Sequence, residues 1–498
     1  MKSLRDLPDA ELRIFERALV PPKEDIRTIY LIGICGTGMG SLAGLLQQAG
    51  YEVSGSDEAA YPPMSTRLGE MGVHLYEGYD PAHLEPAPDL VVVGNSCTPQ
   101  HPEAAYAREQ GLPQLSMPEA LAHFFMRDRR TLVVAGTHGK TTTTGMLVHV
   151  MRHAGLDPGF LVGGVMVNGN VSYDVGSDKY FVVEGDEYDS AYFDKRPKFM
   201  HYAPTSAIIT SMEFDHADIY DDWDDYREAF RAFAGTVSPD GILALYGDDP
   251  EVRALKDWTR TNARYYGIEG DDDQLSAADV TRVSGGQEFV LVADGERRCK
   301  IFLPMSGRHN LRNALGVCAI ALSEGVAPVT IAEGFATFEG LKRRQEIRGE
   351  AGGVLVIDDF AHHPTAVKET IRAVADRWPD RRLVAVFEPR SNSSRRKVFE
   401  AAYADSFEGA SLVFLSAPPL RHNDRADDLL DPNNVVQKVR AHSHEAWSFQ
   451  NADELLPRLL EHAREGDVVL IMSNGSFGGI HDKLLHALRE RQPVSERG

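Results

Sequence analysis

The sequence predicts an α/β fold made of three doubly wound domains. Short apolar stretches that read as strands alternate with helical stretches along most of the chain, which is typical of parallel sheets covered by helices. The alternation restarts twice with a fresh strand, and no fixed repeat period links the three series. The 498 residues suffice for about three domains of ~150 residues each. We therefore expect domains at residues 1–127, 128–342 and 343–498.

The first series contains predicted strands in TIYLIG, YEVSGSD and PDLVVVGN and a helix in MGSLAGLLQQAG. Between its first strand and this helix lies GICGTGMG, whose glycines allow a tight turn and let a phosphate approach backbone N–H groups. Asp57 ends the next strand, where an acidic residue can hold a ribose hydroxyl. Taken alone, these residues favour a Rossmann-like domain that binds NAD or FAD. The alternative is a tight turn that binds nothing, and a diphosphate-sized anion site is the safer prediction.

The other two series follow the same alternation. The second has predicted strands in KYFVVEGD, TSAIITSM and GILALYG, an irregular stretch with a solvated acidic turn at Asp271–Asp273, and a closing helix in NLRNALGVCAIALSEG. The third has predicted strands in VLVIDDF, RLVAVFEP, ASLVFLS and DVVLIMSNG.

The stretch AGTHGKTTTT, which starts the second series, predicts a phosphate-binding loop. Lys140 can reach the β- and γ-phosphates of a nucleotide, and the Thr141 hydroxyl can bind Mg²⁺. The following hydroxyls and N–H groups lie at a predicted helix N-terminus, where the helix dipole favours anions. The usual loop of this kind has a glycine where this chain has Val134, which indicates a variant loop. A glycine-rich cap before an ordinary helix is the structural alternative.

Acidic side chains follow two later strands of the same series. Because the carboxyl ends of parallel strands converge on one crevice, we expect these groups to meet the phosphate loop, where a metal or an attacking group would need them. Two acidic surface loops are the alternative, which we prefer for Asp221, Asp222, Asp224 and Asp225. The expected site groups are Glu184, Asp186, Glu187, Glu213, Asp215, His216 and Asp218.

Composition excludes several classes of protein. The formal net charge of −22 argues against nucleic acid or an anionic membrane as a partner. Four scattered cysteines form no C-x-x-C pair, so we expect neither a structural zinc site nor disulfides, and a cytoplasmic location fits best. No apolar run approaches the ~18 residues of a membrane span. The charged first twenty residues lack the apolar centre of a signal peptide and read as an amphipathic helix or a frayed arm.

Six motifs, in order, make the chain similar to the Mur ligases, ATP-dependent enzymes that form amide bonds in the bacterial cell-wall peptide. The motifs are GICGTGMG, AGTHGKTTTT, VVEGDEYD, EFDHADIY, GRHNLRNAL and DDFAHHPTAV, and they span all three predicted domains. The resemblance implies a Rossmann-like UDP-binding first domain, a P-loop ATP-binding central domain and a Rossmann-like third domain that binds peptide. It replaces the dinucleotide interpretation, because the same glycines serve a UDP diphosphate.

The resemblance also implies roles for individual residues. Lys140, Glu184 and His216 would be catalytic, with ATP and Mg²⁺ as cofactors. Thr141 and Glu184 would bind Mg²⁺, and His216 a second Mg²⁺. The UDP-sugar would contact Gly36, Gly38, Asp57, Asn95 and Ser96. ATP would contact Gly136, Thr137, His138, Gly139, Lys140, Thr141, Thr142, Asn310, Asn313, Arg344 and Asp359. Some relatives carry a carbamylated lysine shortly after the metal-binding histidine, but this chain has no lysine between His216 and Lys256, so we expect an unmodified site.

Within the family the chain resembles members that attach the tripeptide L-alanyl-γ-D-glutamyl-meso-diaminopimelate to UDP-N-acetylmuramate in cell-wall recycling. YPPMST, DKRPKFMHY, FEPRSNSS and MSNGSFGGIH carry this resemblance. Arg390 suits a bidentate grip on a carboxylate, although a surface ion pair is the alternative. With Asn392 and Asn474 it would form the peptide site.

Several alternatives stay open from the sequence. They are a ligase that adds free L-alanine, a dinucleotide-dependent oxidoreductase and a non-catalytic ATP-binding switch. The general base, the breadth of peptide specificity and the oligomeric state are not determined by the sequence.

Overall fold

The structure, a computed structural model, describes residues 17–59, 64–214, 219–268, 274–391, 393–420, 428–442 and 445–491. The chain packs as two compact units. The first unit comprises Met1–Asp279, Val290–Ile301 and Arg312–Phe338, and the second comprises Val280–Phe289, Phe302–Leu311 and Glu339–Gly498. The predicted domains 1–127 and 128–342 thus fall mainly in the first unit, and the predicted boundary between them stays a prediction.

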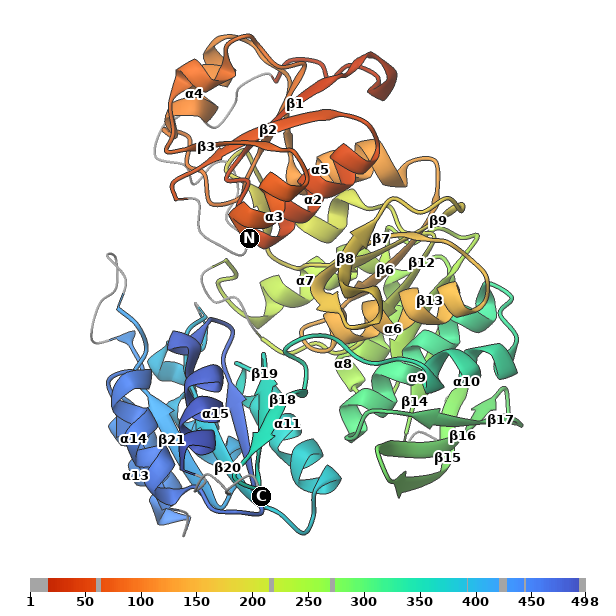
Figure 1. Ribbon diagram of the computed structural model, residues 1–498. Coiled ribbons are helices and arrows are strands. Elements are labelled where there is room, and N and C mark those ends of the chain that lie inside the picture. The colour runs from red at the N-terminus through yellow and green to blue at the C-terminus, as the bar shows by residue number, and fades with distance from the viewer. Residues whose placement is uncertain are drawn as a thin grey trace, which may run out of the picture. The chain divides into compact units, whose positions relative to one another are not determined.

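The N-terminal sheet of the first unit has five parallel strands in the order β3-β2-β1-β4-β5 (Figure 1). Ile29 and Leu31 of β1 belong to the apolar cluster that includes helix α2, whereas Tyr30 and Ile32 pack with helix α4. This alternation explains why both faces are covered. The elements are β1 Thr28–Ile32, α2 Thr37–Gln48, β2 Glu52–Asp57, α3 Met64–Glu70, β3 His74–Glu77, β4 Leu90–Val93, α4 Pro102–Glu109, β5 Gln114–Ser116 and α5 Met117–Leu121.

The central sheet has ten strands in the order β17-β16-β15-β14-β13-β12-β6-β9-β7-β8. Its strands from β15 to β7 pair in parallel, and β8 pairs antiparallel with β7 at one edge. The strands are β6 Arg130–Ala135, β7 Gly159–Met166, β8 Val171–Asp174, β9 Tyr180–Gly185, β12 Ser206–Ile209, β13 Ile242–Tyr246, β14 Asn262–Gly267, β15 Leu275–Val283, β16 Gly286–Ala293 and β17 Glu296–Leu303. The helices are α6 Lys140–His153, α7 Trp223–Ala234, α8 Pro250–Arg253, α9 Arg308–Ser323 and α10 Pro328–Ala336. A separate hairpin joins β10 Asp189–Ala191 to β11 Asp194–Pro197.

The second unit contains a six-stranded sheet in the order β18-β19-β23-β20-β21-β22. The strands from β19 to β22 in this order are parallel, and β18 is an antiparallel edge strand. Two apolar clusters cover its two faces, one formed with helices α11 to α13 and the other with α14 and α15. The elements are β18 Glu346–Ala351, β19 Val354–Asp359, α11 Pro364–Arg377, β20 Arg382–Phe387, α12 Glu400–Ser406, β21 Leu412–Ser416, α13 Pro432–Ala441, β22 Glu445–Phe449, α14 Ala452–His462, β23 Asp467–Met472 and α15 Ile480–Glu490.

Short 3-10 or π turns complete the described elements. They are η2 Lys23–Asp25, η3 Pro81–Leu84, η4 Ala122–Met126, η5 Asn168–Asn170, η6 Lys198–His201, η7 Ala254–Trp258, η8 Lys397–Phe399 and η10 Phe477–Gly479.

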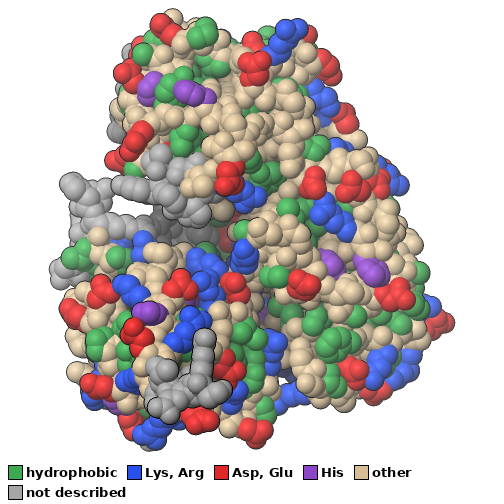
Figure 2. Space-filling view, viewed as in Figure 1, with side chains coloured by type: hydrophobic (Ala, Val, Ile, Leu, Met, Phe, Trp, Pro, Cys, Tyr) green, Lys and Arg blue, Asp and Glu red, His purple; other side chains and the backbone are tan. Residues whose placement is uncertain are grey.

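The surface carries charges of both signs. On the face shown in Figure 2, acidic and basic side chains are interspersed rather than gathered by sign. Within the described ranges, every helix is too short or too polar to cross a bilayer.

The predicted α/β fold of three domains is confirmed, whereas the antiparallel strands β8 and β18 were not anticipated. The acidic loop expected at residues 221–225 is wrong in part, because Asp222 caps helix α7. Its carboxylate accepts the N–H groups of Asp224 and Asp225, and acids in a first turn suit the helix dipole. The first twenty residues were predicted to form an amphipathic helix or a frayed arm; residues 1–16 lie outside the described residues, and residues 17–20 form no helix. The acidic turn at Asp271–Asp273 also lies outside the described residues.

Candidate functional site

The predicted phosphate loop connects strand β6 directly to helix α6. Gly136 and Gly139 have φ values of 128° and 83°, which L side chains rarely adopt. A Cβ atom on Gly136 would lie 2.2 Å from Thr210 Oγ1, and one on Gly139 would lie 2.6 Å from Asn313 Oδ1. Both positions therefore require glycine. Because α6 begins at Lys140, the N–H groups of its first turn have no partner within the helix and lie at the end of this loop, as an anion site requires.

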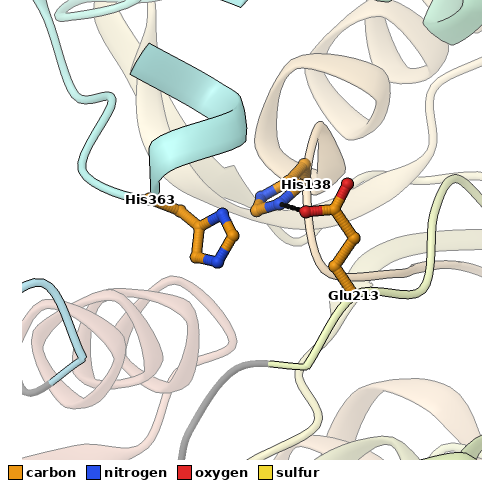
Figure 3. Close-up of side chains that lie close together, drawn as sticks. All are labelled: His138, Glu213 and His363. Carbon is orange, nitrogen blue, oxygen red and sulfur yellow. Dashed lines mark hydrogen bonds and ion pairs between the residues drawn. The ribbon is translucent and has the colours of Figure 1, made fainter. Parts of the chain in front are cut away.

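The loop is held from the adjacent strand end. Thr137 N donates to Ser211 O and His138 N donates to Ser211 Oγ, each with a donor–acceptor distance of 3.0 Å. The Thr137 hydroxyl accepts from Glu213 N at 2.9 Å and donates to Glu213 O at 3.0 Å. The His138 ring lies 3.2 Å from the Glu213 carboxylate, as the dashed line in Figure 3 marks. These contacts fix the loop backbone before any phosphate arrives.

Lys140 turns its ammonium into the loop. Its Nζ donates to Gly136 O at 2.7 Å and to Glu187 Oε2 at 2.8 Å, and only 13% of the side chain is exposed. Burial by itself disfavours the charge, but Glu187 and Asp186 outweigh it, so the pKa of Lys140 is raised above its ordinary value. Lys140 therefore stays protonated, and an anion in the loop would compete with Glu187 for it.

Thr141 and Glu184 form the expected metal pair. The Thr141 hydroxyl donates to Glu184 Oε2 at 3.0 Å, and both residues are buried. Burial and then the nearby Asp186 carboxylate raise the pKa of Glu184 to about 7. Hydroxyl and carboxylate oxygens are ligands that Mg²⁺ prefers, so the donors fit this ion. Val134, the departure from the usual loop, is a buried β6 residue that pairs in register with Glu184.

Two asparagines of helix α9 were predicted to contact ATP. Asn313 is 1% exposed, and within the described part of the chain its Oδ1 atom has no hydrogen-bond partner. Since this atom also lies against Gly139, it is placed to accept a hydrogen bond from a ligand at the loop. Asn310 is equally buried, but its amide already donates to Ser306 O at 2.8 Å.

The remaining acidic group is only partly described. Glu187 and Glu213 contact the phosphate loop as expected. The predicted ligand His216, together with Asp215 and Asp218, lies outside the described residues. Its role stays a prediction.

The glycine loop of the N-terminal sheet is held through backbone atoms and one carboxylate. Gly33 N and Ile34 N donate to Ser56 O at 2.8 and 3.0 Å, and Cys35 N donates to Asp57 Oδ2 at 2.8 Å. Helix α2 begins after Gly36. Gly36 and Gly38 lie at this helix start, and Asn95 and Ser96 follow β4, on the other side of β1, with exposed side chains. The predicted UDP-sugar residues thus gather where the strand order reverses.

Sequence reasoning missed the buried carboxylate beneath this loop. Glu103 is 0% exposed and accepts hydrogen bonds from Tyr30 Oη at 3.0 Å, Asp80 N at 3.1 Å and the Ser56 hydroxyl. Ser56 O in turn holds the glycine loop. HPEAAYARE reads as an ordinary helix start, so nothing in the sequence pattern marked Glu103.

In the second unit, Asp359 is buried at the end of β19. It accepts Gln345 N and Ala361 N at 2.8 Å each. Burial raises its pKa, partly offset by the nearby guanidinium of Arg344. That guanidinium lies 4.8 Å from the Phe360 ring centroid, within cation–π range. Their predicted contact with ATP stays a prediction.

The predicted peptide residues surround the turn after β23. Arg390 packs so tightly on Gly475 that a Cβ there would lie 2.2 Å from Arg390 Cδ. Arg343, which sequence reasoning missed, donates to Ser473 O and Gly475 O at 2.6 Å each. Asn474 Oδ1 is buried and, among the described residues, lacks a hydrogen-bond partner. Asn392 lies outside the described residues.

Three domain models of one protein family match successive parts of the chain. Residues 28–129 match the Mur ligase family catalytic domain, residues 134–321 the Mur ligase middle domain and residues 343–475 the Mur ligase glutamate ligase domain.

Individual proteins are also similar to this chain over nearly their whole length. The chain is 40% identical over 475 residues to the UDP-N-acetylmuramate–L-alanyl-γ-D-glutamyl-meso-2,6-diaminoheptandioate ligase of Escherichia coli (strain K12), covering 94% of this chain and 100% of that protein. It is 33% identical over 458 residues to the UDP-N-acetylmuramate–L-alanine ligase of Desulfosudis oleivorans, covering 92% and 97%. A crystal structure of a murein peptide ligase from Psychrobacter arcticus matches with a TM-score of 0.70 and 34% identity, over 94% of this chain and 100% of that one.

Proposed function

Because the chain belongs to the Mur ligase family, we propose that it joins L-alanyl-γ-D-glutamyl-meso-diaminopimelate to UDP-N-acetylmuramate at the expense of ATP, in murein recycling. Members of this family are ATP-dependent ligases that form amide bonds. The observation that carries the substrate assignment is the 40% identity to the Escherichia coli tripeptide ligase over that protein's whole length.

The first chemical step makes the muramate carboxylate reactive. A carboxylate oxygen attacks the γ-phosphorus of ATP, the bond to the β–γ bridging oxygen breaks, and ADP leaves with the electron pair. Lys140 would give up its hydrogen bond to Glu187, bind the transferring phosphoryl group and neutralise the negative charge on that group. The N–H groups at the start of α6 would hold the phosphates that remain on ADP.

Magnesium would be held by Thr141 and Glu184, whose side-chain oxygens already lie 3.0 Å apart. Bound there, Mg²⁺ would supply positive charge next to the phosphate oxygens. His216 is proposed as the ligand of a second ion, on resemblance to the family alone.

The second step forms the amide. The α-amine of the tripeptide's alanine attacks the acyl carbon, inorganic phosphate leaves with the bonding electrons, and the amine gives up a proton. Carboxylates of the cluster around Glu184, or His216, are candidates to accept it. Arg390 and Asn474 would hold the carboxylate-rich end of the peptide, and Asn392 is proposed as a further peptide ligand on resemblance to the family alone. The Arg390–Gly475 packing supports this, as does the Asn474 oxygen, which has no hydrogen-bond partner among the described residues.

In this proposal each of the three predicted domains binds a different substrate. Residues 1–127 bind the UDP-sugar through Gly36, Gly38, Asp57, Asn95 and Ser96. Residues 128–342 bind ATP through Gly136, Thr137, His138, Gly139, Lys140, Thr141, Thr142, Asn310 and Asn313. Residues 343–498 bind the peptide and add Arg344 and Asp359 to the nucleotide site.

A second candidate is the ligase that adds free L-alanine, because the Desulfosudis oleivorans relative of that name is 33% identical over most of both chains. Phosphate release decides between them. The protein is incubated with ATP, Mg²⁺ and UDP-N-acetylmuramate, and with either L-alanine or the tripeptide. We expect release with the tripeptide. Release with free alanine alone would replace the proposal by the second candidate, and release with neither would refute both.

A further inference from the structure

A second buried lysine lies beside the acidic cluster, within the motif DKRPKFMHY, which assigned no role to it. Lys198, in η6, is 9% exposed. Its Nζ lies 3.5 Å from Asp186 Oδ2, and the ammonium sits 4.2 Å from the Tyr188 ring centroid. Lys198 N donates to Tyr188 O and Phe199 N donates to Asp186 O, so backbone hydrogen bonds fix this lysine against the segment that follows β9.

The Lys198 ammonium is not saturated. The two acids on either side of Asp186 already have close partners, since Glu184 accepts from Thr141 and Glu187 accepts from Lys140 at 2.8 Å. By contrast, Lys198 Nζ makes no hydrogen bond to any described residue, and its distance to Asp186 exceeds the 2.7–2.9 Å typical of charge-assisted hydrogen bonds. An ammonium on a largely buried side chain, with no hydrogen bond to a described residue, is suited to an oxyanion that enters the site.

The segment that carries Lys198 also reaches the N-terminal sheet. The β10–β11 hairpin begins just after Glu187 and ends one residue before Lys198. At its tip, Tyr192 and Phe193 belong to the apolar cluster of Tyr30 and Ile32, the β1 residues that lead into the first glycine loop. Arg108 of helix α4 donates to Tyr192 Oη at 3.3 Å. One short hairpin thus links the predicted UDP-sugar domain to the acidic cluster.

Two anions must meet at this cluster if the proposed function holds. The nucleotide phosphates have Lys140 and the start of α6. The other anion is the lactyl carboxylate of the muramate, which extends from the UDP-sugar toward the phosphoryl group. Lys198 directly follows the hairpin whose tip packs against the UDP-sugar domain, whereas Lys140 begins helix α6, so we assign the two lysines to different anions.

We propose that Lys198 binds the carboxylate of the UDP-sugar substrate and then the acyl phosphate formed from it. The inference rests on the proposed function and adds a specificity residue to it. Lys198 forms and breaks no covalent bond. It neutralises one negative charge on the nucleophile, which brings the carboxylate within reach of the γ-phosphorus despite three nearby acidic side chains.

The test compares two UDP-sugars that differ by this carboxylate. UDP-N-acetylmuramate has the lactyl group and UDP-N-acetylglucosamine lacks it. Calorimetric affinities are measured with Mg²⁺ and a non-hydrolysable ATP analogue for the wild type, Lys198→Met, Lys198→Arg and Lys195→Met. Lys195 is the matched control, because it lies on the same hairpin and pairs with Asp189 at 2.6 Å.

We expect Lys198→Met to weaken UDP-N-acetylmuramate by about 10- to 100-fold, the range for a hydrogen bond to a charged group, and to leave UDP-N-acetylglucosamine unchanged. Lys198→Arg should restore part of the difference, and Lys195→Met should change neither affinity. Equal loss for both sugars, or no loss for either, would overturn the proposal. If the wild type binds neither sugar, the proposed function itself fails. An unchanged thermal midpoint and ATP-analogue affinity in Lys198→Met show that the variant is folded.

Discussion

The two glycine loops of the first unit have the same strand–loop–helix arrangement but differ in the charged side chains around them. Each leaves a parallel strand and opens a helix. The first loop, at β1, has no lysine or arginine, and an aspartate accepts one of its N–H groups. The second loop, at β6, holds Lys140 between its own carbonyl groups and Glu187, with Thr141 and Glu184 beside it.

This difference shows what a glycine pattern can and cannot indicate. Glycines allow backbone N–H groups to approach an anion in both loops. Only the buried charges around the second loop suit a phosphoryl group that moves, because a changing charge requires a cation that can follow it. The first loop therefore fits an intact diphosphate, and the second fits a reacting triphosphate.

The largest expected effect comes from removing the cation of the second loop. Lys140→Met should lower kcat at least about a thousandfold, because charge on the transferring phosphoryl group would lose its partner. UDP-sugar affinity should stay at the wild-type value, because the first loop contains no part of Lys140. Phosphate release and calorimetry measure the two quantities. Near-normal turnover would mean that the second loop differs from the first only in shape.

Gly139→Ala should have the next largest effect. The new Cβ would need the φ of 83° and would meet Asn313 Oδ1 at 2.6 Å. We expect kcat/KM for ATP to fall about 100-fold through misplacement of the loop. Gly155→Ala is the matched control, with a φ of 79° and no atom within 4 Å of the added Cβ. It should cost about 1–2 kcal/mol of unfolding free energy and leave kcat/KM unchanged. A similar kinetic loss in both variants would assign the effect to backbone strain alone.

Glu103→Ala tests the support of the first loop. Removing this carboxylate leaves Tyr30 Oη, Ser56 Oγ and Asp80 N without their acceptor. We expect a loss of about 1–3 kcal/mol in the free energy of unfolding and a weaker UDP-sugar affinity, with ATP-analogue affinity retained. Urea titration and calorimetry distinguish these outcomes. Equal weakening of both ligands would show that the two loops are not supported independently.

The smallest expected effect is a pH dependence near the first loop. His101 precedes helix α4, and neither ring nitrogen has a hydrogen-bond partner among the described residues. Burial lowers the pKa of His101, and Glu103 offsets part of this shift. The unfolded chain therefore binds the proton more readily, so this contribution to stability should be lost as pH falls through the ordinary histidine value of about 6.5. Urea unfolding at pH 7.5 and 5.5 should show a smaller loss for His101→Gln than for wild type. An identical loss would place the acid sensitivity elsewhere.

The strand–loop–helix order and the site-bearing loops were predictable because they depend on local pattern. Lys140, Thr141, Glu184 and Asp57 all lie at the predicted strand ends or helix starts, and the structure brings the first three together. The edge strands β8 and β18 were not predictable, because antiparallel pairing at an edge depends on which strand lies alongside. Glu103 and Arg343 were missed for the same reason, because their partners are distant in sequence and no spacing rule connects them. Lys198 lies in a quoted motif, but only the fold of the hairpin and η6 brings it to Asp186.

The α/β class, the two predicted anion-binding loops and the residue types that phosphoryl transfer requires can be read from the amino-acid order, since glycine placement, apolar alternation and charge are all local properties. Which acid each lysine faces depends on the folded chain. Glu187 accepts a hydrogen bond from Lys140 at 2.8 Å, whereas Lys198 lies 3.5 Å from Asp186 and makes no hydrogen bond to a described residue. Such distances follow from how β9, the hairpin and η6 fold back on one another. Burial then strengthens the electrostatic interactions between these charges.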